Sequence, residues 1–253
     1  MTENDLRHLQ RMREHELALI LPLLPAGCRI LEIGAGIGWQ AKALAEKGFI
    51  VTAIDIPGTS SRVWPVQEYD GEHIPFPERS FDVVFSSNVL EHISHVIQFQ
   101  NELVRVLKPN GRAIHILPSG SWRFWTSLAY YPHLVARLAQ RLFGNTVSES
   151  SIGGAATPAS RQRMLKAILP PRHGEVGNFM SEIYSFSRWR WQRLFQRSGW
   201  QVEGYQHSRM FYTGYTLLGM KLGVRVRGWL SCFMGSTCHV FCLKPVEKAS
   251  DRI

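Results

Sequence analysis

The chain has 253 residues, of which 45% are hydrophobic and 19% are charged. This composition excludes a disordered chain, and the length is sufficient for the core of one full-sized α/β domain. The cysteines form no CxxC pair and no Cys/His ligand pattern, so we expect unpaired thiols in a reducing compartment and no metal site. They are Cys28, Cys232, Cys238 and Cys242.

The net charge of +9 is unevenly distributed along the chain. Residues 1–120 carry 11 basic and 14 acidic side chains, whereas residues 121–253 carry 18 basic and 6 acidic ones, which gives −3 and +12. A basic C-terminal half indicates an anionic partner, such as a phosphorylated substrate, a membrane surface or nucleic acid. The alternative is a basic face that only contacts solvent.

The N-terminal segment predicts a helix over residues 5–21, because its apolar residues recur near helical spacing. The apolar stretch 17–24 resembles the start of a signal peptide, but it is short, is broken by Pro22 and runs into the first strand. No apolar run reaches the roughly 18–20 residues needed to span a bilayer. We therefore expect a cytoplasmic protein that is able to touch a membrane.

Residues 29–55 predict a strand, a glycine-rich turn, a helix and a second strand. The apolar run 29–33 is typical of a buried parallel strand, and the turn that follows it contains glycines at 34, 36 and 38. Glycines there permit a tight turn and the close approach of a ligand. Asp55 ends the second strand, where a carboxylate can accept hydrogen bonds from ribose hydroxyls. Glu32, just before the turn, would repel a pyrophosphate and suits a cationic ligand.

The next elements are predicted from apolar runs: a weak third strand at 66–69, a fourth strand at 81–86, a helix at 96–107 and a fifth strand at 113–117. Asp70 and Asn88 follow the third and fourth strands, so we expect them at the same edge of the sheet as Asp55. The sequence Lys108-Pro109-Asn110-Gly111 is predicted to end the helix.

These motifs resemble those of the class I S-adenosylmethionine (SAM)-dependent methyltransferases. The resemblance rests on E-x-G-x-G-x-G at 32–38, D-x-E-x-I-P-F-P-x-x-S-F-D-V-V at 70–84, L-x-H at 90–92 and L-K-P-x-G at 107–111. It covers roughly residues 28–120. The downstream motifs are similar to those of the type 11 subfamily, which methylates small molecules that include quinone and sterol precursors.

The resemblance implies a doubly wound, Rossmann-like α/β fold with a mainly parallel seven-stranded sheet, an antiparallel last strand and a helical or loop insertion. It implies SAM as the cofactor. The cofactor-binding residues that it implies, together with Asn88 from its position, are Glu32, Gly34, Ala35, Gly36, Gly38, Asp55, Ile56, Asp70, Gly71, Glu72 and Asn88. We expect a single domain over 1–253, with the SAM-binding core at 28–118, an insertion or substrate lid at 119–186 and the rest of the fold at 187–245.

The predicted lid combines an aromatic and aliphatic segment at 121–143 with a Gly/Ser/Thr/Ala-rich loop at 145–160. After it, the sequence predicts a helix at 187–198, a sixth strand at 200–206 and a seventh at 237–244. A hydrophobic and basic insertion at about 208–236 separates the last two strands. Its cations are Lys221, Arg225 and Arg227. This pattern suits a helix in a membrane interface, a lid over an apolar pocket or a dimer contact, and we favour contact with lipid or a lipid-linked acceptor.

His92 and His173 are the candidate catalytic residues, because imidazole titrates near neutrality and an oxygen acceptor needs a base. The alternative for His92 is that it only orients its loop. Glu175 and Tyr184 are further candidates on the acceptor side of the site.

We expect a methyltransferase for a small, hydrophobic or lipid-linked acceptor, which positions both reactants and excludes water. An RNA methyltransferase is the alternative among enzymes, because the C-terminal half is basic and aromatic. No NPPY-like or SPPY-like sequence follows the fourth strand, so nucleic acid is not the favoured partner. A SAM-binding regulatory protein without turnover is the alternative from another class.

Overall fold

The computed structural model describes residues 3–58, 61–143, 169–175, 177–213 and 222–246. Its strands are β1 (Arg29–Ile33), β2 (Ile50–Asp55), β3 (Gln67–Glu68), β4 (Phe81–Ser87), β5 (Leu107–Pro118), β6 (Trp200–His207) and β7 (Cys238–Pro245). Its α-helices are α1 (Glu3–Ile20), α2 (Trp39–Ala45), α3 (Val96–Val106), α4 (Gly120–Phe143), α6 (Phe179–Ser185), α7 (Arg188–Arg197) and α8 (Val224–Met234). Two short 3-10 helices, η1 (Leu21–Leu23) and η2 (Leu90–His92), complete the described elements.

The strands form one seven-stranded sheet in the order β3-β2-β1-β4-β5-β7-β6. The first five strands of this order are parallel, and β7 runs antiparallel to both of its neighbours. The predicted fold class is therefore confirmed. The order reverses between β1 and β4, and such a reversal opens a crevice at the carboxyl ends of the strands.

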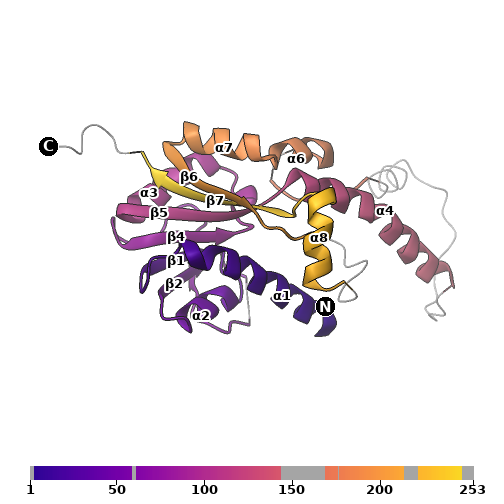
Figure 1. Cartoon of the computed structure of the whole chain (residues 1–253), viewed down its shortest axis with the longest axis horizontal. Coiled ribbons are helices and arrows are strands. Elements are labelled where there is room, and N and C mark those ends of the chain that lie inside the picture. Colours follow the sequence, from indigo (N-terminus) through magenta and orange to yellow (C-terminus); the bar gives the residue numbers. More distant parts are fainter. Residues whose placement is uncertain (1–2, 59–60, 144–168, 176, 214–221, 247–253) are drawn as a thin grey trace, which may run out of the picture.

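Helices cover both faces of the sheet, as Figure 1 shows. Helices α1 and α2 bury Leu17 and Leu44 on one face, whereas α3 and α7 bury Leu103 and Phe195 on the other. Strand β1 contributes to both cores, because consecutive side chains of a strand point to opposite faces. This two-sided burial explains why β1 is mainly apolar, with Ile30, Leu31 and Ile33 buried.

The predicted end of the helix before Lys108 is confirmed to within one residue, but the segment Lys108–Gly111 is part of β5, which begins at Leu107 and not at Ala113 as predicted. Helix α3 ends at Val106, and the next residue is already extended. The pairing of β4 with β5 is irregular between Phe81 and Val83, and Asn110 has a left-handed φ of 65°. The signals that favoured a helix cap therefore belong to a bulge in the first part of the strand.

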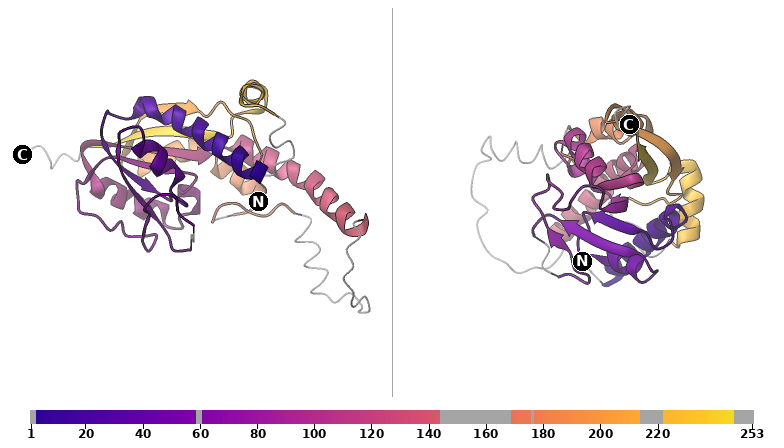
Figure 2. Two further views of the ribbon diagram at one scale, coloured as in Figure 1. Left: turned by 90° about the horizontal axis from the view of Figure 1, so that it is seen from below. Right: turned by 90° about the vertical axis from the view of Figure 1, so that its left-hand side faces the viewer.

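The insertion after β5 begins with α4, which extends away from the sheet (Figures 1 and 2). The predicted loop at 145–160 lies outside the described residues. The chain returns through α6, whose N-terminus is closed by a capping box between Asn178 and Ser181. The insertion between β6 and β7 contains α8, and the predicted helix at 187–198 is confirmed as α7.

Candidate active site

A cavity of about 630 Å³ lies at the carboxyl ends of the first four strands. Gly34 follows β1, Asp55 ends β2, Tyr69 follows β3 and Asn88 follows β4, and all four line the cavity. The first turns of α3 contribute Gln98 and close the opposite side. The cavity therefore sits at the reversal of strand order, where ligands bind in open α/β sheets.

The glycine-rich turn after β1 adopts a backbone that L-residues with side chains rarely adopt. Gly34, Gly36 and Gly38 have φ values of 71°, 57° and 81°. A Cβ at Gly34 would collide with Val89, and one at Gly38 would come within 2.7 Å of the Cβ of Trp64. A Cβ at Gly36 would meet nothing within 4 Å, so the space beside Gly36 is open. Packing thus requires glycine at two of these positions, and the backbone requires it at all three.

The Asp55 carboxylate connects this turn to β2. Its Oδ2 accepts a hydrogen bond from the Gly36 N–H at 2.5 Å, and its Oδ1 accepts one from the Ile56 N–H at 2.7 Å. The same carboxylate lines the cavity. Because each carboxylate oxygen can accept more than one hydrogen bond, Asp55 keeps acceptor capacity for a ligand.

Asp70 forms the β3 side of the cavity. Its Oδ1 accepts hydrogen bonds from the backbone N–H groups of His73 and Glu72 at 2.7 and 2.8 Å. These bonds lower the pKa of the exposed carboxyl to about 2, so Asp70 is anionic at neutral pH. With Asp55 and Glu102 also in the lining, the cavity carries negative charge that suits a cationic ligand.

The predicted cofactor-binding residues divide into two groups. Those that line the cavity are Gly34, Asp55, Ile56, Asp70, Gly71, Glu72 and Asn88. Those that lie in or below the glycine-rich turn are Glu32, Ala35, Gly36 and Gly38. Glu32 is only 2% exposed, and burial raises its pKa to about 8 although the charge of Arg13 opposes this rise. Glu32 therefore supports the turn from inside the sheet.

Helix α1 fixes the end of β4, which sequence reasoning did not foresee. Arg13 Nη1 donates to Glu16 Oε2 at 2.7 Å and to Ser87 Oγ at 2.6 Å. Asn88 Nδ2 then donates to the same Ser87 Oγ at 3.1 Å. Asn88 itself has a left-handed φ of 55°. The Arg13 and Glu16 pair looks like an ordinary solvent-facing pair in the sequence, and no local signal connects it to β4.

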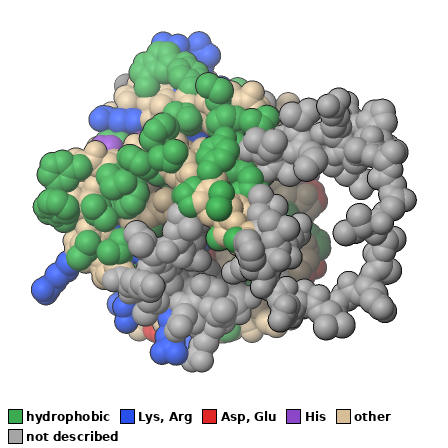
Figure 3. Space-filling view, turned by 90° about the vertical axis from the view of Figure 1, so that its right-hand side faces the viewer, with side chains coloured by type: hydrophobic (Ala, Val, Ile, Leu, Met, Phe, Trp, Pro, Cys, Tyr) green, Lys and Arg blue, Asp and Glu red, His purple; other side chains and the backbone are tan. Residues whose placement is uncertain are grey.

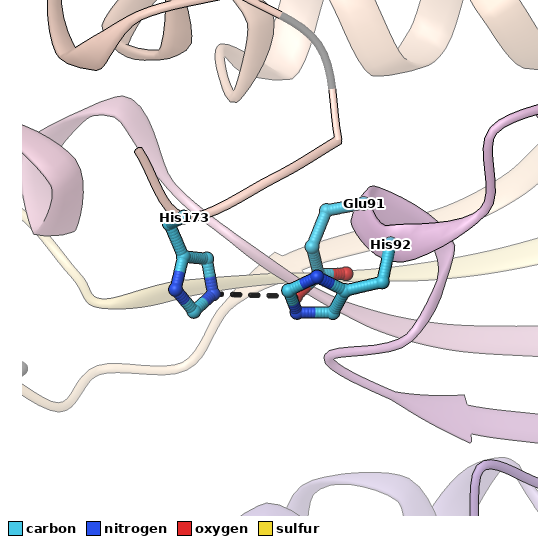
Figure 4. A group of neighbouring side chains, drawn as sticks. All are labelled: Glu91, His92 and His173. Carbon is cyan, nitrogen blue, oxygen red and sulfur yellow. Dashed lines mark ion pairs between the residues drawn. The ribbon is translucent and has the colours of Figure 1, made fainter. Parts of the chain in front are cut away.

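Both candidate catalytic histidines lie in one group, which also contains Glu91 (Figure 4). The ring centroids of His92 and His173 are 4.9 Å apart. Burial lowers the pKa of His92, and it lowers the pKa of His173 to about 4, so both rings are neutral at pH 7. His92 lines the cavity, which places the group beside the cofactor-sized space.

Glu91 was missed because the L-x-H motif draws attention only to its histidine. Its side chain is fully buried, and neither carboxylate oxygen has a hydrogen-bond partner among the described residues. Burial raises its pKa to about 8. A buried carboxyl without partners is costly, which indicates a functional reason for its position.

A buried ion pair between α4 and α6 holds the backbone at His173. Glu182 Oε2 lies 2.6 Å from Arg123 Nε, and its Oε1 accepts hydrogen bonds from the N–H groups of His173 and Gly174, each at 2.7 Å. Glu182 and Arg123 are 0% and 3% exposed. The insertion therefore places His173 precisely opposite His92 through charged groups that the sequence did not single out.

The remaining acceptor-side candidates lie further from this group. Glu175 donates its N–H to the carbonyl of Glu91 at 3.3 Å, but its side chain is exposed. Tyr184 is 56% exposed and contacts Trp189, with 6.0 Å between the ring centroids. The structure thus brings Glu175 next to the histidines through its backbone and does not bring Tyr184 there.

Comparison with known proteins agrees with this geometry. A family model described as a methyltransferase domain matches residues 31–115. The chain is 33% identical over 165 residues to the biotin biosynthesis bifunctional protein BioHC of Cellvibrio japonicus, which covers 60% of this chain and 32% of that protein. It is 27% identical over 183 residues to the demethylmenaquinone methyltransferase of Tropheryma whipplei, with 67% and 70% covered. The chain thus spans about a third of BioHC.

A solved structure shows the same fold. The SAM-dependent methyltransferase of Mesorhizobium loti superimposes with a TM-score of 0.52 at 14% identity, over 90% of this chain and 97% of that one. Together with the glycine-rich turn and the acidic cavity, the match of residues 31–115 to the family model identifies this part of the chain as a class I SAM-dependent methyltransferase domain, whose cofactor is SAM.

Proposed function

We propose that the protein transfers the methyl group of SAM to a small, hydrophobic or lipid-linked acceptor. The observation that carries this proposal is the position of the two histidines at the end of the cofactor cavity, next to aromatic rings. His173 contacts Trp122 and Phe186, with ring centroids 4.7 and 6.2 Å apart. Trp122 and Phe186 are buried, so these rings make the surroundings of the histidines apolar, which suits a hydrophobic acceptor.

The names of the two relatives support a small-molecule acceptor. One is named as a demethylmenaquinone methyltransferase and the other as a biotin biosynthesis protein. Neither of these two names supports the RNA methyltransferase or the regulatory protein, so the small-molecule enzyme is the function that we propose.

The cavity lining supports an orientation for the cofactor. Asp55 lies where it can accept hydrogen bonds from the ribose hydroxyls, and Asp70 with Gly71 lies on the β3 side, where the adenine would sit. Asn88 is next to His92 on the β4 side, where the methionine end and its sulfonium would face the acceptor. The anionic lining favours the cationic sulfonium of SAM over its neutral product.

Methyl transfer is an in-line displacement in which the acceptor forms a bond to the methyl carbon as the carbon–sulfur bond breaks. The protein positions the two reactants and keeps water out. For a hydroxyl acceptor, a neutral His92 or His173 can take the proton, because burial keeps both imidazoles unprotonated. A neutral amine nitrogen is nucleophilic enough to attack before it loses a proton, so a nitrogen acceptor needs no base.

A surface outside the cavity supports contact with lipid. On α4, Phe124, Leu128, Tyr131 and Val135 recur at helical spacing, and each is at least 41% exposed. On α8, Trp229 and Phe233 are 64% and 75% exposed. We call these six residues the α4/α8 apolar face, and Figure 3 shows hydrophobic side chains gathered on this side of the molecule.

The two helices that carry the α4/α8 apolar face are connected by a hydrogen bond. Trp125 Nε1 on α4 donates to the carbonyl of Met234 at the end of α8, at 2.8 Å. The exposed cations Arg209 and Arg225 lie on or next to α8 and suit anionic headgroups. Arg227, which the sequence placed among the surface cations, is instead 5% exposed and donates to the carbonyl of Phe211 at 3.0 Å.

Lys221, the third predicted cation, lies outside the described residues. Among the helices that are described, none combines the length and the apolar character needed to cross a bilayer. The proposed contact is therefore one in which the α4/α8 apolar face lies in the interface.

The experiment for the function is transfer of label from methyl-labelled SAM into a cell extract, which is then separated into lipid, small-molecule, protein and nucleic-acid fractions. An Asp55→Ala protein is the control. We expect label in the lipid or small-molecule fraction with the wild type alone. Label in nucleic acid would instead support the RNA methyltransferase, and intact SAM binding without label in any fraction would argue against turnover.

The membrane contact is tested with liposomes that contain anionic lipid. Trp229→Ala/Phe233→Ala should bind at least tenfold more weakly than the wild type, because burial of each aromatic side chain contributes about 1.5–3 kcal/mol. Trp189→Ala is the matched control, since Trp189 is 50% exposed but lies on α7 under Arg193. Equal binding by the double variant and the wild type would rule out this contact.

A further inference from the structure

We propose that Glu91, His92 and His173 bind a divalent transition-metal ion, with Zn²⁺ as the ion that their donor set fits best. One ligand atom of each residue lies within 4.8 Å of those of the other two. Two imidazoles and one carboxylate form a donor set found in catalytic zinc sites. Binding of the ion does not depend on the proposed function, whereas its role in catalysis does.

The distances from Glu91 Oε1 to the two imidazole nitrogens are close to those between the ligand atoms of a site that contains a metal ion. Glu91 Oε1 lies 3.9 Å from His92 Nε2 and 4.0 Å from His173 Nε2 (Figure 4). Tetrahedral bonds of about 2.0–2.2 Å bring ligand atoms to about 3.4 Å from one another. Contraction of roughly half an ångström would bring Glu91 Oε1 to this distance from both nitrogens, and the two imidazoles, whose ligand atoms lie within 4.8 Å of each other, would approach by up to about 1.4 Å.

Glu91 gives an independent reason for a cation. Both of its carboxylate oxygens lack a hydrogen-bond partner in the described part of the chain, although the side chain is fully buried. Buried charged groups in proteins are usually paired, hydrogen-bonded or bound to a metal. The imidazole nitrogens, at 3.9 and 4.0 Å, are too far from Glu91 Oε1 for a hydrogen bond, and a bound cation would supply the missing partner.

Contacts around the group hold the backbone and the ring of His173 in place. The N–H of His173 is bound by Glu182, which is itself paired with Arg123. The ring of His173 packs edge-on against Trp122 at 4.7 Å. The carbonyl of Glu91 accepts the N–H of Glu175, so the segments that carry the ligands are also connected to each other.

Three protein ligands leave one position of a tetrahedral ion open. His92 lines the cofactor cavity, so the open position would face the acceptor next to the SAM methyl group. A hydroxyl bound there becomes more acidic. Its proton leaves to solvent, and the oxygen lone pair forms the O–C bond as the S–C bond of the sulfonium breaks. An oxygen acceptor is the class that such a site favours.

The experiment measures Zn²⁺ binding to tag-free protein that has been treated with a chelator, without SAM or acceptor. Calorimetry should show one Zn²⁺ per chain, and Zn²⁺ should raise the thermal midpoint of the wild type. Glu91→Gln, His92→Ala and His173→Ala should each weaken binding at least tenfold and lose that rise. His207→Ala is the matched control, because its side chain is exposed and His207 does not belong to the group.

Two outcomes would overturn the inference: no stoichiometric Zn²⁺ binding to the folded wild type, or binding that all three ligand variants retain. Circular dichroism identifies any variant that fails to fold, and His173→Gln then replaces His173→Ala. SAM binding is measured in parallel. SAM binding without Zn²⁺ binding rejects the metal site and leaves the proposed methyltransferase function unaffected. Zn²⁺ binding without methyl transfer supports the metal site and argues against the proposed function.

Discussion

Replacement of Asp55 by asparagine tests the cofactor cavity most directly. The carboxylate accepts the Gly36 and Ile56 N–H groups at 2.5 and 2.7 Å, and its remaining acceptor positions face the cavity. An amide keeps one acceptor oxygen, so the turn loses one charged hydrogen bond and the ribose loses a second. One hydrogen bond to a charged group contributes about 1.5–3 kcal/mol, which corresponds to a dissociation constant for SAM about 10–150 times larger.

Calorimetric titration with SAM measures this change, and Asp82→Asn is the matched control. Asp82 also accepts a backbone N–H, from Arg29 at 2.8 Å, but it lies at the start of β4, at the opposite edge of the sheet. We expect the control to bind SAM as the wild type does. A dissociation constant for Asp55→Asn within twofold of the wild type would refute the role of this carboxylate.

Three further predictions concern stability. Gly34→Ala combines a left-handed backbone with a collision against Val89, and should lower the free energy of unfolding by about 2–4 kcal/mol in urea denaturation; a loss below about 0.5 kcal/mol would contradict the packing argument. Arg123→Ala leaves the buried Glu182 without its cation and should cost about 3–5 kcal/mol, whereas Arg123→Met/Glu182→Gln should recover part of that loss. Because burial raises the pKa of Glu32 from 4.5 to about 8, its contribution to the free energy of unfolding is fully present below pH 4.5 and is lost as the pH rises to about 8. Between these pH values the free energy of unfolding of the wild type should fall by about 1.4 kcal/mol per pH unit because of Glu32, and Glu32→Gln should not show this part of the fall. Urea unfolding in EDTA measures it, and the same pH dependence in both proteins would contradict the prediction.

Local signals in the sequence are sufficient to predict the strands of the sheet and the edge at which the cavity lies. Strands buried on both faces are mainly apolar, as β1 and β4 are. A turn with left-handed φ values requires glycine, and Gly34, Gly36 and Gly38 supply it. The parallel arrangement then brings the carboxyl ends of the strands together. The sequence therefore predicts that Asp55 and Asn88 lie at the same edge of the sheet, where both line the cavity.

Local signals in the sequence are misleading where the same residues are compatible with two kinds of local structure. Lys108–Gly111 has the residues of a helix end, but pairing with β4 continues past it and turns it into a bulge of β5. Arg227 carries a charge in an apolar helix and therefore looked like a surface cation. Only the packing of α8 against Phe211 shows that its guanidinium is buried.

The set of side chains that meet on the acceptor side of the cavity depends on tertiary packing. His173 meets His92 and Glu91 because Arg123 on α4 and Glu182 on α6 form a buried pair that holds its backbone. None of these contacts follows from spacing along the chain, because each joins elements whose relative position is set by the packing of the whole insertion. Cofactor binding thus depends on motifs of a few neighbouring residues, whereas the acceptor site depends on side chains that meet only when the folded core brings their helices together.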